Sequence, residues 1–144
     1  MPGLHLDEVE AAYLRTRRYI ERGQEDALEF LSDATWEGLE RDRIVVDAAF
    51  FLLIFGQIED RINTLARGRL TARQQPTLRS LKFDKRLGLA LPNNTTLKSV
   101  IEGWYEDRSD AAHGRSVASA YDIPAMLARA REIEAQLIGA GTVL

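Results

Sequence analysis

The sequence predicts an all-α fold in which the whole chain, residues 1–144, forms one antiparallel bundle of five to six helices. Apolar residues recur at the three- and four-residue spacing of amphipathic helices almost throughout, and the alternating apolar and polar residues of half-buried strands are absent. A chain of 144 residues with 45% apolar residues has the size and composition of one globular domain.

Residues 7–39 predict two helices. Asp7 and Glu10 resemble a capping pair at the start of the first helix. Gly23 is expected to break this helix, because glycine is a weak helix former. A short second helix then covers residues 27–39.

The third helix is expected to be the longest, from Arg41 to Arg67. Residues 44–55 are apolar on nearly every side of such a helix, whereas residues 58–65 place apolar side chains along one stripe. A helix that is apolar all round is buried, so this one should lie at the centre of the bundle.

Residues 68–144 predict a basic loop at 68–77, a short helix at 78–87 and two longer helices. After a break at 91–95, Thr95 or Thr96 caps the fifth helix, which stops near Gly114. The last helix should be capped by Asp122, with Pro124 in its first turn, and ended by Gly139 and Gly141.

The composition excludes several classes of site and location. The absence of cysteine excludes a disulfide scaffold, a thiolate zinc site and a cysteine nucleophile, and two histidines argue against a multi-histidine metal site. The longest apolar stretch, residues 44–56, is too short to cross a bilayer. Residues 1–10 lack the basic and apolar regions of a signal peptide. We therefore expect a soluble, cytoplasmic protein that does not associate with membranes.

Charge is distributed unevenly along the chain. Residues 1–60 carry six basic and fourteen acidic side chains, residues 61–100 carry nine and one, and residues 101–144 carry four and seven. The net charge of −3 therefore conceals a segment of +8. This segment suits a polyanion such as RNA, although solvated helix faces explain the same charges equally well.

Residues 104–115, WYEDRSDAAHGR, contain the most informative group of side chains. Arg108 lies five residues before His113, near the end of the fifth expected helix. An arginine binds phosphate and a histidine transfers a proton near neutral pH, which are the requirements for attacking a phosphodiester without a metal. On a regular helix the two side chains point about 140° apart, so they converge only if the helix loosens or both edge one groove.

A structural explanation of the same pair stays open. Arg108 then forms an ion pair with an acid such as Asp107 or Glu59, and His113 only ends a helix. Glu59 has two interpretations of its own: it faces the Arg108 groove, or it is a surface carboxylate paired with Asn63 or Arg61.

The segment from Arg108 to His113, RSDAAH, resembles the signature of the HEPN superfamily of helical domains, in which an arginine and a polar residue precede a histidine near the end of the penultimate long helix. A preceding long helix with FGQIEDRINTLA at residues 55–66 and one closing helix match the same context. The resemblance covers residues 42–140 and implies an HEPN-like bundle.

The resemblance implies a metal-independent endoribonuclease that needs no cofactor. His113 would transfer protons at the ribose 2′-hydroxyl and the leaving group, Arg108 would stabilise the charge on the phosphate, and Ser109 would orient one of them. The product would be a 2′,3′-cyclic phosphate. Arg115 and Tyr105 are the candidates for contacting RNA, although an aromatic residue at helical spacing is more often part of a core.

The same resemblance implies partners and a biological role. Many HEPN domains are toxins or defence effectors, act as homodimers whose motifs line one cleft, and have a cognate antitoxin protein. Two alternatives remain: a catalytically silent HEPN-fold dimer that binds a nucleotide, RNA or a partner protein, and a helical adaptor in which Arg108 and His113 are incidental.

Overall fold

A computed structural model describes residues 6–30, 32–112 and 122–142, and every element within these ranges is helical. The elements are α1 (Leu6–Glu29), α2 (Asp33–Gly68), the 3₁₀ helix η1 (Gln75–Ser80), α3 (Phe83–Ala90), α4 (Thr95–Ala112) and α5 (Ile123–Thr142). The all-α prediction is confirmed, with five α-helices and one 3₁₀ helix in the described chain.

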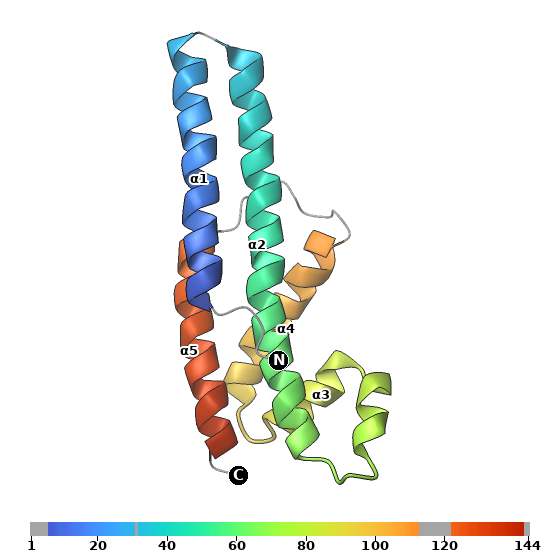
Figure 1. Cartoon of the computed structure of the whole chain (residues 1–144). Helices are drawn as coiled ribbons and strands as arrows, with labels where there is room; N and C mark the ends of the chain where they lie inside the picture. The colour runs from blue at the N-terminus through green and yellow to red at the C-terminus, as the bar shows by residue number, and fades with distance from the viewer. Residues whose placement is uncertain (1–5, 31, 113–121, 143–144) are drawn as a thin grey trace.

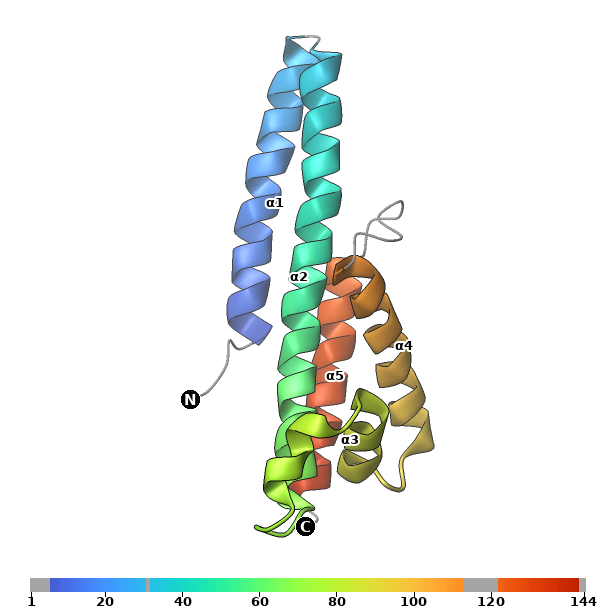
Figure 2. The ribbon, with the colours of Figure 1, turned by 90° about the vertical axis from the view of Figure 1, so that its right-hand side faces the viewer.

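The fold is built around α2, which contacts every other helix of the described chain. Helices α1 and α2 form a long antiparallel hairpin, and α5 packs beside them at one end (Figure 1). Helix α4 crosses α2 on the side away from α1, while η1 and α3 lie at the C-terminal end of α2 (Figure 1; Figure 2). None of the described helices has the length and apolarity needed to span a membrane.

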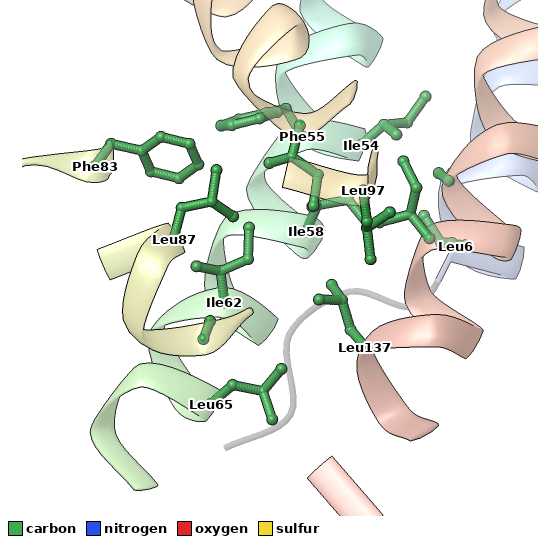
Figure 3. Close-up of a cluster of buried hydrophobic side chains, with 14 of the residues drawn as sticks. Leu6, Ile54, Phe55, Ile58, Ile62, Leu65, Phe83, Leu87, Leu97 and Leu137 are labelled. Atoms are coloured by element: carbon green, nitrogen blue, oxygen red, sulfur yellow. The ribbon is translucent and has the colours of Figure 1, made fainter. Parts of the chain in front are cut away.

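The core explains the central position of α2. Phe51, Ile54, Phe55, Ile58 and Ile62 are fully buried along this helix. Figure 3 shows four of them, Ile54, Phe55, Ile58 and Ile62, together with side chains from the other helices. These partners are Leu6, Phe83, Leu87, Leu97 and Leu137. Each such side chain contributes roughly 1.5–3 kcal/mol by leaving water, so one stripe of α2 holds the bundle together.

The predicted break at Gly23 is wrong. Helix α1 continues through Gly23 to Glu29, and the chain turns at Phe30 and Ser32 instead. A Cβ atom at position 23 would lie 2.8 Å from Leu39 Cδ1, so glycine allows α1 and α2 to approach closely there. Tertiary packing thus offsets the helix-propensity cost of glycine, which is about 1 kcal/mol.

The short second helix predicted for residues 27–39 does not exist as a separate element. Its first residues belong to α1, and its later residues belong to α2, which begins at Asp33 rather than Arg41. Two helices that pack side by side stabilise further turns at each other's ends, because each buries the apolar inner face of its neighbour. The hairpin is therefore longer than the sequence pattern indicated.

The predicted helix at 78–87 is also divided differently. Extended backbone at Leu81 and Lys82 separates η1 from α3, which runs three residues beyond the expected end. Phe83 and Leu87 of α3 are buried against α2, so the apolar side chains that suggested the helix fix its position.

The caps of the last two helices are partly as predicted. Helix α4 begins at Thr95, but the side chain that caps it is Asn94, whose Oδ1 accepts a hydrogen bond from the Leu97 N–H at 3.0 Å. Asp122 caps α5 as expected, accepting from the Ala125 N–H at 3.1 Å. Helix α5 does not end at Gly139 or Gly141 but continues to Thr142, and Gly114 lies outside the described residues.

The expected capping pair at the start of α1 has another partner. Both carboxylates, Asp7 and Glu10, accept hydrogen bonds from the guanidinium of Arg131 on α5. The two acids therefore join the N-terminus of α1 to α5.

Candidate functional site

A groove of about 440 Å³ lies between the middle of α2 and the C-terminal part of α4. Its α2 wall carries Leu52, Gly56, Glu59, Asp60 and Asn63, which recur at helical spacing on the flank of α2 beside the core stripe. Arg108 lines the groove from α4. Gly56 leaves the wall open, since a Cβ atom there would touch nothing within 4 Å.

Arg108 is held in this groove by Glu59 and Tyr105. Its Nε atom lies 3.7 Å from Glu59 Oε2, an ion-pair distance longer than a hydrogen bond. Its guanidinium carbon lies 5.8 Å from the Tyr105 ring centroid. The Arg108 and Glu59 side chains are 40% and 23% exposed, so the pair contributes less than about 1 kcal/mol to stability. Its main effect is to orient the guanidinium.

Tyr105 is fixed by an aromatic stack that reaches α3. The Tyr105 and Phe83 rings lie 4.4 Å apart with an interplanar angle of 11°. Both rings also contact Phe55 of α2. The candidate role of Tyr105 in stacking on RNA bases is therefore restricted, because much of its ring is already packed against the core.

A second arginine completes the arrangement. The Arg86 guanidinium carbon lies 5.6 Å from the Phe83 ring centroid, and its Nη1 donates a hydrogen bond of 2.7 Å to Asn63 Oδ1. Asn63 lies one turn after Glu59 on α2. The side chains of α2 thus hold one arginine from α3 and another from α4.

The groove itself is acidic, whereas one neighbouring end of the molecule is basic. Glu59 and Asp60 outnumber Arg108 among its charged lining residues. The segment 61–100, with a net charge of +8, forms the end of α2, η1, α3 and the start of α4.

The structure brings together three of the predicted site residues, Arg108, Glu59 and Tyr105. Ser109 follows in the last turns of α4, which ends at Ala112. His113 and Arg115 lie outside the described residues. The pairing of Arg108 with Glu59 agrees with both interpretations of the sequence, since either a catalytic or a structural arginine can use it.

Sequence reasoning missed Asn63 as a groove residue and the pairing of Arg86 with it. Asn63 follows Glu59 at a spacing of four residues, a signal that could have placed it on the same helix face. Arg86 carried no such signal, because only the packing of α3 on α2 brings it to Asn63.

A second polar cluster lies between α1, α2 and the start of α5. Asp47, only 3% exposed, lies close to Tyr13, Arg17 and Arg43. These residues and Asp122 line a hollow of about 430 Å³. Asp47 interrupts the apolar run of residues 44–56, and the structure places it at the contact between α1 and α2.

Two groups of this cluster, the Asp47 carboxyl and the Tyr13 phenol, have raised pKa values. Burial raises the pKa of the Asp47 carboxyl, while the Arg17 guanidinium and the Tyr13 hydroxyl act in the opposite direction. Burial, followed by the Asp47 charge, raises the pKa of Tyr13 to about 12. The cluster therefore contains a neutral phenol and a carboxyl group that is more easily protonated than usual.

No set of three potential ligands among the described residues could hold a metal ion. Comparisons with models of protein families, with curated proteins and with solved structures found no match to this chain.

Proposed function

We propose that this protein is a metal-independent endoribonuclease of the HEPN type, which cleaves RNA through attack by the ribose 2′-hydroxyl. One observation carries the proposal. Arg108, from the motif that resembles the HEPN signature, lines a groove, and Glu59 forms an ion pair with its guanidinium there. A partly exposed arginine in a fixed orientation suits a phosphate whose negative charge grows in the transition state.

In the proposed reaction the 2′-oxygen attacks the adjacent phosphorus and gives its proton to a base, and the 5′-oxygen of the next nucleotide leaves with a proton from an acid. His113 performs the proton transfers, since its ordinary pKa near 6.5 suits both roles. Arg108 stabilises the phosphorane-like transition state, and Ser109 orients one of the two. The products are a 2′,3′-cyclic phosphate and a 5′-hydroxyl.

The basic end of the molecule supports RNA as the substrate. Arg67, Arg69, Arg73, Arg79, Lys82 and Lys85 are exposed there. Arg86 of the same segment donates a hydrogen bond to Asn63, which lines the Arg108 groove, so the basic segment reaches the edge of the site. Arg115 is proposed as a further RNA contact beside the motif. RNA bound along this surface would bring one phosphate to Arg108.

The proposed biological role is that of a toxin or defence effector in the cytoplasm. Its partners would be RNA, a second copy of the chain whose motif shares the cleft, and a cognate antitoxin protein. A second copy would add another Arg108 and His113 to what is otherwise a small catalytic set.

Incubation of the purified protein with RNA in EDTA tests the proposal. Wild-type protein should leave cyclic-phosphate ends, and His113→Ala should lower the rate by about 10²–10⁴. The matched control is His5→Ala, which replaces the other histidine of the chain. The wild-type rate should depend on pH around roughly 6–7.

Arg108→Ala should also lower the rate, whereas Arg129→Ala, which removes an arginine of similar exposure on α5, should not. Cleavage that needs added Mg²⁺, or that His113→Ala leaves unchanged, contradicts the assignment. Salt-sensitive RNA binding without cleavage would favour the silent binding module instead.

A further inference from the structure

The hairpin of α1 and α2 projects beyond the other helices. Its outer part, residues 18–42, which we call the arm, extends past α4 and α5 in both views (Figure 1; Figure 2). Inside the arm, Ile20 and Ala27 are buried between the two helices. Outside, Tyr19 is 76% exposed and Phe30 is 77% exposed. Large apolar side chains exposed on a projecting element commonly mark an interaction surface.

One stripe of α1 has an ordered pattern of charge. Its residues recur at alternating spacings of four and three, the repeat of a coiled-coil contact, and all are exposed. They are Arg15, Tyr19, Arg22, Asp26 and Glu29. The half of the stripe nearer the bundle is basic, and the half nearer the tip is acidic.

This pattern is complementary to itself. When two such helices pack antiparallel about a two-fold axis, the basic half of each meets the acidic half of the other, and every contact is made twice. A pairing that places Arg22 against Asp26 of the partner subunit satisfies both charges. A parallel pairing would instead set like charges against each other.

The same register places an aromatic ring at a hollow. In an antiparallel pair, a step toward the C-terminus of one helix meets a step toward the N-terminus of the other. Counting four residues beyond Asp26 brings Phe30 of the partner subunit, the first residue after α1, to the level of Arg18 along the pair. Arg18 belongs to a hollow of about 220 Å³ that is also lined by Arg15, Tyr19 and Arg22. A cavity of about 150 Å³ holds a benzene ring, so the hollow has room for this side chain.

We propose that the arm is a self-association surface, on which a second copy of the chain packs antiparallel along α1 and inserts Phe30 into the hollow beside Tyr19. Arginine side chains over the ring and the exposed Tyr19 ring add cation–π and aromatic contacts. The ring and the hollow that receives it lie on the same chain, which selects a second copy over other partners. This contact is independent of the nuclease, since Arg108 lies on α4, across α2 from the arm.

Charge exchange across the contact provides the test. Sedimentation equilibrium should show that the wild-type chain self-associates at micromolar concentration. Arg22→Asp and Asp26→Arg each create two pairs of like charges, and each should weaken association at least about tenfold. The double variant Arg22→Asp/Asp26→Arg exchanges the charges and should restore it. If the wild-type assembly is larger than a dimer, each single variant should halve its mass.

Phe30→Ser gives an independent variant, which should weaken association without changing charge. Arg73→Asp is the control. It changes the charge by the same amount as Arg22→Asp, at an exposed position in the turn after α2, and this variant should associate as wild type does. All the altered residues are exposed, so the variants should remain helical, and circular dichroism verifies this. A monomeric wild-type chain, single variants that associate normally, or a double variant that does not recover would each overturn the proposal.

Discussion

Arg108 Nε and Glu59 Oε2 lie 3.7 Å apart and join α4 to α2 across the candidate groove. Through this ion pair Glu59 acts on Arg108 and not directly on a ligand. The carboxylate is a positioning group: it holds the guanidinium at the groove, and Tyr105, three residues earlier on α4, limits the movement of the guanidinium from its own helix. The orientation of Arg108 therefore depends on two helices that the chain joins only through η1 and α3.

Glu59→Gln should reduce RNA cleavage, because the neutral amide holds the Arg108 guanidinium less firmly. We expect a fall of about tenfold to a hundredfold, the effect of misplacing a group that meets the transition state. Cleavage rates for Glu59→Gln, Arg108→Ala and the double variant measure the coupling, and the two losses should not add. Asp60→Asn, which neutralises the neighbouring carboxylate of the groove, is the control. Fully additive losses would show that Glu59 acts independently of Arg108.

Asp47→Asn should change how stability depends on pH. Burial raises the pKa of the Asp47 carboxyl in the folded state, so folding favours its protonated form. The resulting stability is fully present below the unfolded pKa, about 3.9, and is lost as the pH rises through the folded value. Asparagine cannot ionise, so the variant should gain stability relative to wild type as the pH rises above about 4.

Urea unfolding of both proteins across this pH range measures the difference in free energy of unfolding. Asp42→Asn, at an exposed position on the same helix, should show no comparable change with pH. A difference between wild type and Asp47→Asn that is constant with pH would contradict the assigned effect of burial.

Gly23→Val should destabilise the hairpin by roughly 1–3 kcal/mol, because the added side chain must displace Leu39 from its contact with α1. Chemical unfolding at a fixed protein concentration provides the measurement. Gly103→Val on α4 is the control, since a Cβ atom there meets nothing within 4 Å. Equal stability changes at the two positions would mean that close approach of the helices does not explain Gly23.

Lys82→Glu and Lys85→Glu should weaken RNA binding and reduce its dependence on salt. Both lysines are exposed at the basic end of the molecule, next to and within α3. A lysine that binds one phosphate of single-stranded RNA adds roughly 0.7 to the slope of log affinity against log salt, so each substitution should lower the slope by this amount. Fluorescence anisotropy at several salt concentrations measures both quantities. Arg129→Glu on α5 is the control, and an equal loss of affinity there would indicate only a general effect of net charge.

The sequence predicted the helical class because helical spacing of apolar residues is a local property. The buried stripe of α2 from Phe51 to Ile62 has this spacing, and the Asp122 cap is equally local. The limits of α1 and α2 could not be predicted in the same way. Gly23 is a weak helix former by itself, and its place inside a helix next to Leu39 of α2 is visible only in the packed hairpin.

The candidate site divides in the same way. Sequence alone identified Arg108 from its motif and offered Glu59 as one of two partners, because spacing and residue type are visible along the chain. Tertiary structure decided that Glu59 faces the groove, that Tyr105 stacks on Phe83, and that Arg86 reaches Asn63. These contacts depend on how α3 and α4 cross α2, and that arrangement is set by burial of apolar surface from several distant segments at once.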